Sequence, residues 1–305
     1  MFAELVSSGS VSDGSSEQVQ WWTFFLTKME VDYRNDSLVL VAHGSTINDQ
    51  SSAAVRQQAE ELRRRHIFAE VHVGLWKEGA PLAEVLQQSC GQRVFVVPFF
   101  VSHGFFTQEI IPKALGLKDG DEVIRRQVRG DQTIYYSSPV GIYPQMTEVL
   151  LARAQGVVAR HPFPRAPKLS NIALFIAGHG TELNENSCLS IERQVELIRA
   201  RGIYQEVHGI FIEEEPKIEK CFTMSQASNF VIVPFFMSDG LHVAEDIPVM
   251  LGEPKRLVQS RLQSGQPTWR NPSEKKGRLV WYSDSVGREP VLAEVILQAV
   301  RDCCV

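Results

Sequence analysis

The chain has 305 residues, of which 44% are hydrophobic, 22% charged and 9% aromatic. This composition excludes a disordered or fibrous chain, and the length is sufficient for two domains of ordinary size. A formal net charge of −5 gives no sign of a nucleic-acid or membrane-surface partner. No apolar stretch approaches the roughly 20 residues that cross a bilayer. We therefore expect neither a nucleic-acid nor a membrane partner.

Residues 1–36 are interpreted as an N-terminal extension. They lack the basic region of a secretory signal, and the aromatic cluster at 21–26 is too short for the apolar part of one. We expect these aromatic side chains to pack on the body of the protein. A partner-binding patch is the alternative.

The five cysteines are scattered, and none forms a Cys-x-x-Cys pair. This arrangement argues against a disulfide framework, a four-thiolate zinc site and an iron–sulfur cluster. We expect a reducing, cytoplasmic location.

An internal repeat covers the rest of the chain. Two motifs occur twice: 37–45 (SLVLVAHGS) with 173–181 (ALFIAGHGT), and 95–102 (FVVPFFVS) with 231–238 (VIVPFFMS). His43 and His179 lie 136 positions apart, and so do Pro98 and Pro234. A constant offset over two long motifs indicates a duplicated domain.

Each copy alternates strands and helices. Apolar runs at 38–42 and 94–100 predict strands that are buried on both faces. Between them, Val55, Ala59 and Leu62 recur at helical spacing. The alternation predicts an α/β fold, with two tandem Rossmann-like, three-layer α/β/α domains that each contain a mainly parallel sheet. We place the first repeat at 37–155, a linker at 156–170 and the second repeat at 171–305.

Three loops of the second repeat carry side chains that can bind a metal ion. His179, Glu213 and His242 each follow a predicted strand, and ligands bind beyond the carboxyl ends of the strands in an open parallel sheet. We therefore expect the three side chains to converge at one sheet edge. Two imidazoles and one carboxylate suit a divalent ion such as Co²⁺, Ni²⁺, Fe²⁺ or Zn²⁺.

The first repeat has His43, Lys77 and Phe106 at the equivalent positions. One ligand type is retained, while a cation and an apolar ring replace the other two. This asymmetry predicts one working site, in the second repeat, and a degenerate site in the first. His43, Phe106 and the nearby His103 are candidates for substrate contact.

At these motifs the sequence resembles the class II tetrapyrrole chelatases, specifically the sirohydrochlorin cobaltochelatases and ferrochelatases of the CbiX type. The resemblance is carried by the His-Gly pairs, by Glu213 after Phe-Ile, and by segment 233–248 (VPFFMSDGLHVAEDIP), and it extends over residues 37–300. It implies two fused chelatase-like domains. Small members of the family are homodimers of one unit, so the fusion is expected to replace a homodimer and to allow a monomer.

The resemblance also implies an activity, which is insertion of Co²⁺, Fe²⁺ or Ni²⁺ into sirohydrochlorin or a related tetrapyrrole in cobalamin or siroheme biosynthesis. The reaction needs no ATP, so the metal is a substrate, the tetrapyrrole is the small-molecule partner, and no nucleotide cofactor is expected. By motif, His179 and His242 match the family's metal-binding and proton-accepting histidines, and Glu213 matches its carboxylate.

Alternatives stay open. A non-catalytic carrier of tetrapyrrole or metal, with the same fold, is consistent with the degenerate first site. A hydrolase that uses His-Gly is disfavoured because no Arg precedes either pair. His43 and His179 also have a structural interpretation as caps of the turn after their strands, and Glu213 belongs to an acidic run, 213–215, that is typical of a solvated loop.

Overall fold

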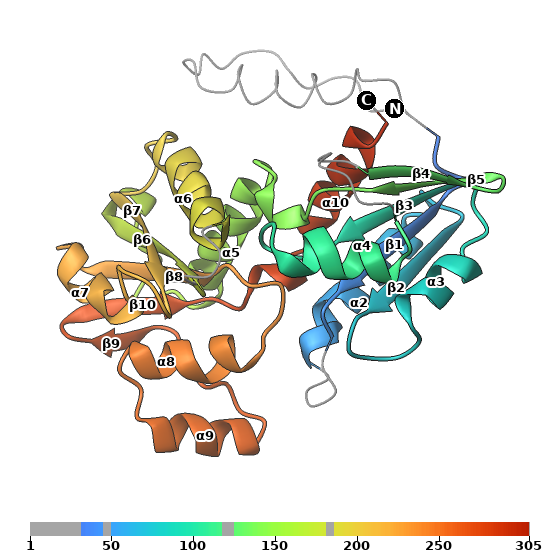
Figure 1. The fold of residues 1–305 in the computed structure, drawn as a ribbon. Helices are drawn as coiled ribbons and strands as arrows, with labels where there is room; N and C mark the ends of the chain where they lie inside the picture. The colour runs from blue at the N-terminus through green and yellow to red at the C-terminus, as the bar shows by residue number, and fades with distance from the viewer. Residues whose placement is uncertain (1–31, 45–49, 118–124, 181–185, 305) are drawn as a thin grey trace, which may run out of the picture. The chain divides into compact units, whose positions relative to one another are not determined.

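The computed structural model describes residues 32–44, 50–117, 125–180 and 186–304 (Figure 1). The aromatic cluster at 21–26, which was expected to pack on the body, lies outside the described residues. The chain after Asp32 forms one compact unit. No helix of the described ranges is long and apolar enough to cross a membrane.

Two five-stranded sheets organise this unit. The first repeat contains β1 (Ser37–Ala42), α2 (Gln50–Arg64), β2 (Glu70–Leu75), α3 (Leu82–Gln88), β3 (Arg93–Pro98), η1 (Phe106–Ile110), α4 (Ile111–Ala114), β4 (Arg125–Arg129), β5 (Gln132–Tyr136), η2 (Val140–Ile142) and α5 (Met146–Arg160). The second contains η3 (Leu169–Asn171), β6 (Ile172–Gly178), α6 (Asn186–Arg199), β7 (Glu206–Phe211), η4 (Ile218–Lys220), α7 (Cys221–Met224), β8 (Asn229–Pro234), η5 (His242–Asp246), α8 (Ile247–Met250), α9 (Lys255–Gln263), β9 (Ser273–Lys275), β10 (Arg278–Tyr282), η6 (Val286–Arg288) and α10 (Leu292–Asp302).

The strand orders are β2-β1-β3-β5-β4 and β7-β6-β8-β10-β9. In each sheet the first four strands are parallel, and only the last pair, β4 with β5 or β9 with β10, is antiparallel. The predicted α/β fold with mainly parallel sheets and an internal duplication is confirmed.

Burial follows the apolar pattern of the sequence. All residues of β1 and β6 are buried, as expected for central strands covered on both faces. The helical stripe of Val55, Ala59 and Leu62 is at most 1% exposed. The sheets therefore hold the loops that follow their strands on a well-packed base.

The last helix of each repeat packs on the other repeat. Helix α5 contacts α6, β8 and β10, whereas α10 contacts α2, β3 and η2 (Figure 1). One apolar core consequently contains residues of both repeats, among them Phe95, Leu150, Val231 and Ile296. Helix α5 ends at Arg160, so it continues into the segment interpreted as a linker.

Two equivalent glutamines bind the repeats to each other. Gln58 on α2 is 1% exposed, and its Nε2 donates to the carbonyls of Gly287 at 3.0 Å and Glu289 at 2.8 Å. Gln194 on α6 is fully buried and donates to the Tyr143 carbonyl at 3.1 Å. The accepting segments follow the last parallel strand of the opposite repeat, so these bonds join the carboxyl-terminal edge of each sheet to the other repeat.

Candidate metal centre

His179 and His242 come together at the carboxyl-terminal edge of the second sheet. His179 directly follows β6, and His242 begins η5, a π-helical turn after β8. Their rings meet edge to face, with 4.8 Å between centroids and 81° between planes. The side chains are 35% and 49% exposed, so both rings are accessible from outside.

Both imidazoles are held through Nδ1. Nδ1 of His179 lies 2.8 Å from the carbonyl of Gly180, and Nδ1 of His242 lies 2.7 Å from Oδ2 of Asp246. A carbonyl and a carboxylate can only accept here, so Nδ1 carries the proton in each neutral ring. The lone pair of each Nε2 is then left for a metal ion or a proton.

Glycine is required at position 180. Gly180 has a φ of +64°, and a Cβ there would lie 3.0 Å from the Cβ atoms of Phe211 and Glu214. Only a residue without a side chain combines this left-handed conformation with such close neighbours. The His-Gly pair is therefore a geometric unit, because the glycine aims its carbonyl at the preceding histidine.

Glu213 lies beside His179, on the Nδ1 side of the ring. Its N–H donates to the His179 carbonyl at 2.9 Å, and its Oε2 lies 3.6 Å from His179 Nδ1. The carboxylate, which is 54% exposed, is thus on the anchored side of the ring. Within the described residues, no three His, Cys, Asp or Glu side chains already form a group that could hold a metal ion.

A buried tyrosine stabilises the π-helical turn that carries His242. The N–H of Ile247 donates to the His242 carbonyl, five residues back, and Pro248 has no N–H to offer. The Val243 carbonyl is consequently left without a helical partner, and the Tyr282 hydroxyl donates to it at 2.6 Å. Burial raises the pKa of Tyr282 well above its usual value, which keeps the hydroxyl protonated as a donor.

Tyr282 and Asp246 support this site but were not among the residues predicted from the sequence. Both had signals: Tyr282 is repeated as Tyr136, whose hydroxyl donates to the Thr107 carbonyl at 2.7 Å in the first repeat. Asp246 lies four residues after His242, a spacing that brings two side chains of one helix together.

The first repeat keeps this geometry with different chemistry. His43 Nδ1 lies 3.0 Å from the Gly44 carbonyl, and the Phe106 ring occupies the position of His242, with its centroid 4.8 Å from that of His43. The N–H of Lys77 donates to the His43 carbonyl at 2.9 Å, as that of Glu213 does to His179. His103 lies in the loop between β3 and η1, where burial lowers its pKa.

Comparison with protein sequences identifies relatives of known family. The family model for CbiX matches residues 37–157 and 173–303, one match in each repeat. A probable sirohydrochlorin cobaltochelatase of Halobacterium salinarum is 34% identical over 278 residues, which cover 87% of this chain and 91% of that protein. The sirohydrochlorin cobaltochelatase of Methanocaldococcus jannaschii is 28% identical over 142 residues, which cover 40% of this chain and 99% of that protein.

Solved structures share the fold. A multi-domain Deinococcus radiodurans protein, described as structurally similar to chelatases, aligns over 87% of this chain with a TM-score of 0.71 and 26% identity. The alignment covers 55% of that protein, so this chain spans about half its length. SirB from Bacillus subtilis, determined with Fe³⁺, aligns over 88% of this chain with a TM-score of 0.59 and 14% identity. Because the two family matches together take in most of the sequence, the chain belongs to the CbiX family, with one CbiX domain in each repeat.

Proposed function

We propose that this protein is a metal chelatase that inserts Co²⁺, Fe²⁺ or Ni²⁺ into sirohydrochlorin or a closely related tetrapyrrole without ATP. The His179–His242 pair carries the proposal. Two imidazoles on one ion have centroids about 5 Å apart, because a metal–nitrogen bond of about 2 Å puts each centroid about 3 Å from the ion. The observed 4.8 Å is close to this separation. The sirohydrochlorin cobaltochelatases among the relatives support the same reaction.

Metal insertion requires that the protein binds the ion through only a few ligands. A site with two histidines leaves coordination positions that the pyrrole nitrogens can enter as they displace water. Each M²⁺ that enters the macrocycle replaces two N–H protons, so the overall step is M²⁺ plus metal-free tetrapyrrole giving metallated tetrapyrrole plus two H⁺. An imidazole with a free Nε2 can accept such a proton near neutral pH.

We assign Glu213 the role of third metal ligand. Its carboxylate is exposed, and to reach the ion it would have to rotate from the Nδ1 side of His179 toward the two Nε2 atoms. There it can bind the ion and balance its charge. Asp246 acts indirectly, because it fixes the orientation of the His242 ring.

Anaerobic metal insertion tests the proposal. Metal-free sirohydrochlorin is mixed with Co²⁺ and the protein, and the absorbance change is compared with that of the protein-free reaction. We expect a clear acceleration, and a loss of about 10²- to 10⁴-fold in His179→Ala and His242→Ala. The exposed His161→Ala serves as the control and should retain wild-type activity. Equal rates for wild type and His179→Ala would overturn the proposal.

A carrier of metal or tetrapyrrole is the second candidate function. It is favoured by the position of the Glu213 carboxylate, whose Oε2 lies 3.6 Å from Nδ1 of His179, the ring nitrogen that is already bonded to the Gly180 carbonyl. Tight binding of Co²⁺ or sirohydrochlorin, without insertion faster than the protein-free control, would select this function.

A further inference from the structure

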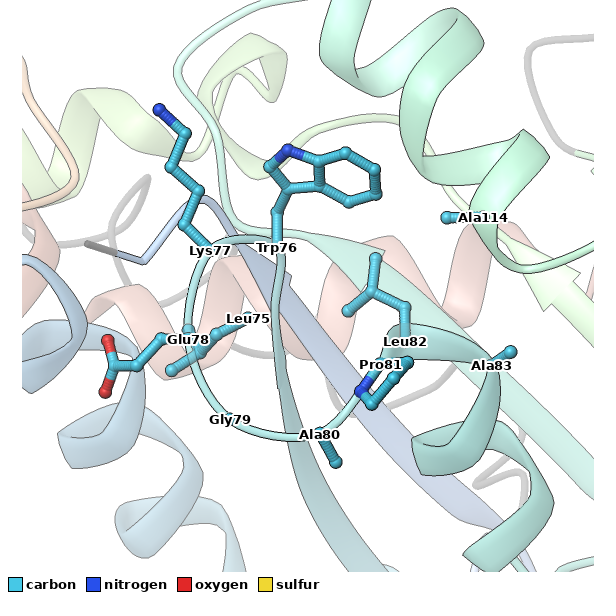
Figure 2. A pocket seen from close by; sticks show the side chains of 10 residues that line it. All are labelled: Leu75, Trp76, Lys77, Glu78, Gly79, Ala80, Pro81, Leu82, Ala83 and Ala114. Carbon is cyan, nitrogen blue, oxygen red and sulfur yellow. The ribbon is translucent and has the colours of Figure 1, made fainter. Parts of the chain in front are cut away.

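The first repeat contains a pocket at the loop between β2 and α3 (Figure 2). Its volume is about 400 Å³, and it is lined by Trp76, Lys77, Leu82 and, from α4, Ala114. Figure 2 shows the side chains of Trp76 and Lys77 extending to the same side of the loop, with the indole on the side of Ala114. The pocket thus combines a cation with a flat apolar ring.

Lys77 is available for an anionic ligand. The neighbouring Glu78 points away from it in Figure 2, and Oε1 of Glu78 is paired with Arg56 Nη2 at 2.9 Å. In the part of the chain that the structure describes, the Lys77 ammonium has no ion pair or hydrogen bond. An exposed ammonium whose acidic neighbour is already paired is suited to bind a carboxylate.

Lys77 is the first-repeat equivalent of Glu213, the proposed metal ligand of the second repeat. Its N–H is bonded to the His43 carbonyl in the way that Glu213 is bonded to His179, so Lys77 occupies the place of a proposed metal ligand. A positive side chain there repels a divalent ion and attracts an anion. Trp76, which is 39% exposed, adds a broad apolar surface next to that charge.

Helix α2 joins the first repeat to the carboxyl-terminal edge of the second sheet. Helix α2 begins after the His43 loop, and its Gln58 donates to Gly287 in η6, which follows the last strand of the second sheet. A Cβ on Gly287 would lie 3.1 Å from the Cβ of Ala54 on α2. Sirohydrochlorin carries carboxylate side chains around its rim, away from the nitrogens that take the metal. A macrocycle centred on His179 and His242 therefore presents carboxylates at a distance from the metal site.

We propose that Lys77 and Trp76 form a binding site for the rim of the substrate, an inference that rests on the proposed function. The ammonium binds a rim carboxylate, and the indole packs against the apolar edge of the macrocycle. The second repeat holds the metal and accepts protons, and the first repeat holds the tetrapyrrole. At this position the second repeat therefore has a carboxylate for the metal, whereas the first repeat has Lys77 for the tetrapyrrole.

Binding and insertion are measured separately to test this site. Equilibrium binding of metal-free sirohydrochlorin is followed by fluorescence quenching, and Co²⁺ insertion by absorbance. In Lys77→Gln we expect the Kd and KM to rise by about three- to tenfold while kcat changes little. Lys77→Arg should recover most of the affinity, and added salt should weaken wild-type binding more than that of Lys77→Gln. Lys168→Gln, an exposed site before η3, removes the same charge and should bind as wild type does.

The outcomes separate the two proposals. If the wild type inserts metal and correctly folded Lys77→Gln binds sirohydrochlorin as the wild type does, the rim site is wrong and the proposed function stands. If the wild type inserts no metal but Lys77→Gln still weakens binding, the chelatase function is wrong and the rim site stands. Thermal melts of each variant, monitored by circular dichroism, establish that the proteins compared are folded.

Discussion

Phe106 meets His43 edge to face at a centroid distance of 4.8 Å and an angle of 79°, and His242 meets His179 at 4.8 Å and 81°. The same ring-to-ring arrangement therefore survives where one of the two imidazoles has been lost. Strand ends, a left-handed glycine and a π-helical turn hold these rings in both repeats. The ring arrangement of the proposed metal site is consequently a property of the domain, and the chemistry of its side chains decides its function.

Restoring the missing side chains should create a second metal site. We expect Phe106→His combined with Lys77→Glu to raise the Co²⁺ stoichiometry from one ion to two, because the first repeat would then present the donor set of the second. Isothermal titration calorimetry measures the stoichiometry. Phe105→His, at a neighbouring side chain that is 60% exposed, is the control and should leave one ion bound. A folded double variant that still binds a single ion would show that the ring arrangement is not sufficient.

Asp246→Asn should weaken metal binding without removing a metal ligand. The carboxylate accepts from Nδ1 of His242 at 2.7 Å, and loss of such an outer partner typically lowers metal affinity by about 10- to 100-fold. A Co²⁺ titration followed by visible absorbance measures the affinity. Asp246→Glu, which keeps the charge, should recover part of it. An unchanged Co²⁺ affinity in Asp246→Asn would argue that η5 orients His242 unaided.

Tyr282→Phe should separate stability from activity when it is compared with Tyr136→Phe. Each change deletes a hydroxyl that donates to a carbonyl of a π-helical turn, at Val243 and Thr107 respectively. Each should lower the free energy of unfolding by about 1–3 kcal/mol, because a buried carbonyl loses its partner. Only Tyr282→Phe should also slow metal insertion, since only that turn carries His242. Urea unfolding and the insertion assay provide the two readings, and equal slowing in both variants would contradict this assignment.

Stability should fall in alkaline solution because of buried thiols. Burial raises the pKa of Cys221 to about 12, whereas a cysteine in the unfolded chain has a pKa of about 8.5. Above that pH the unfolded state releases a proton that the native state keeps. The stabilising contribution is therefore complete below about pH 8.5 and is lost as the pH rises toward 12, by up to about 1.4 kcal/mol per pH unit.

Urea unfolding under reducing conditions from about pH 8 to 11 measures this slope. Cys221→Ala should flatten it, while Cys90→Ala, at an exposed cysteine, should not. An identical slope in wild type and Cys221→Ala would mean that other groups account for the alkaline loss.

The duplication and the approach of the site residues could be read from the sequence for a physical reason. Parallel strands end at one edge of their sheet, so a residue directly after each strand is delivered to the same place. His179, Glu213 and His242 are therefore expected near one another whatever the directions of their side chains. The position of Glu213 on the Nδ1 side of His179 could not be predicted, because the spacing of residues does not determine how a side chain is rotated.

Other features were hidden for different reasons. The apolar stripes of α5 and α10 are the same whichever sheet they cover, so periodicity could not reveal that each helix crosses to the other repeat. The π-helical turn depends on two residues: Pro248 has no N–H for the Val243 carbonyl, and the Tyr282 hydroxyl donates to that carbonyl in its place. These residues are 34 positions apart, and local pattern does not link them. The roles of His43, His103 and Phe106 in substrate contact stay predictions.

The crossing of α5 and α10 has a consequence for how the molecule can be divided. A fragment that ends between the repeats would keep its last helix, α5 or α10, but not the sheet on which that helix packs. Its own sheet would lose the helix that the other repeat supplies. Two complementary fragments should therefore be insoluble or unfolded apart and should recover a native structure when mixed. A lone fragment could bury its uncovered sheet and its last helix only by pairing with a second copy of itself. Covalent continuity between the repeats thus guarantees that each half always meets an unlike partner, which is the condition for the two halves to take on different tasks.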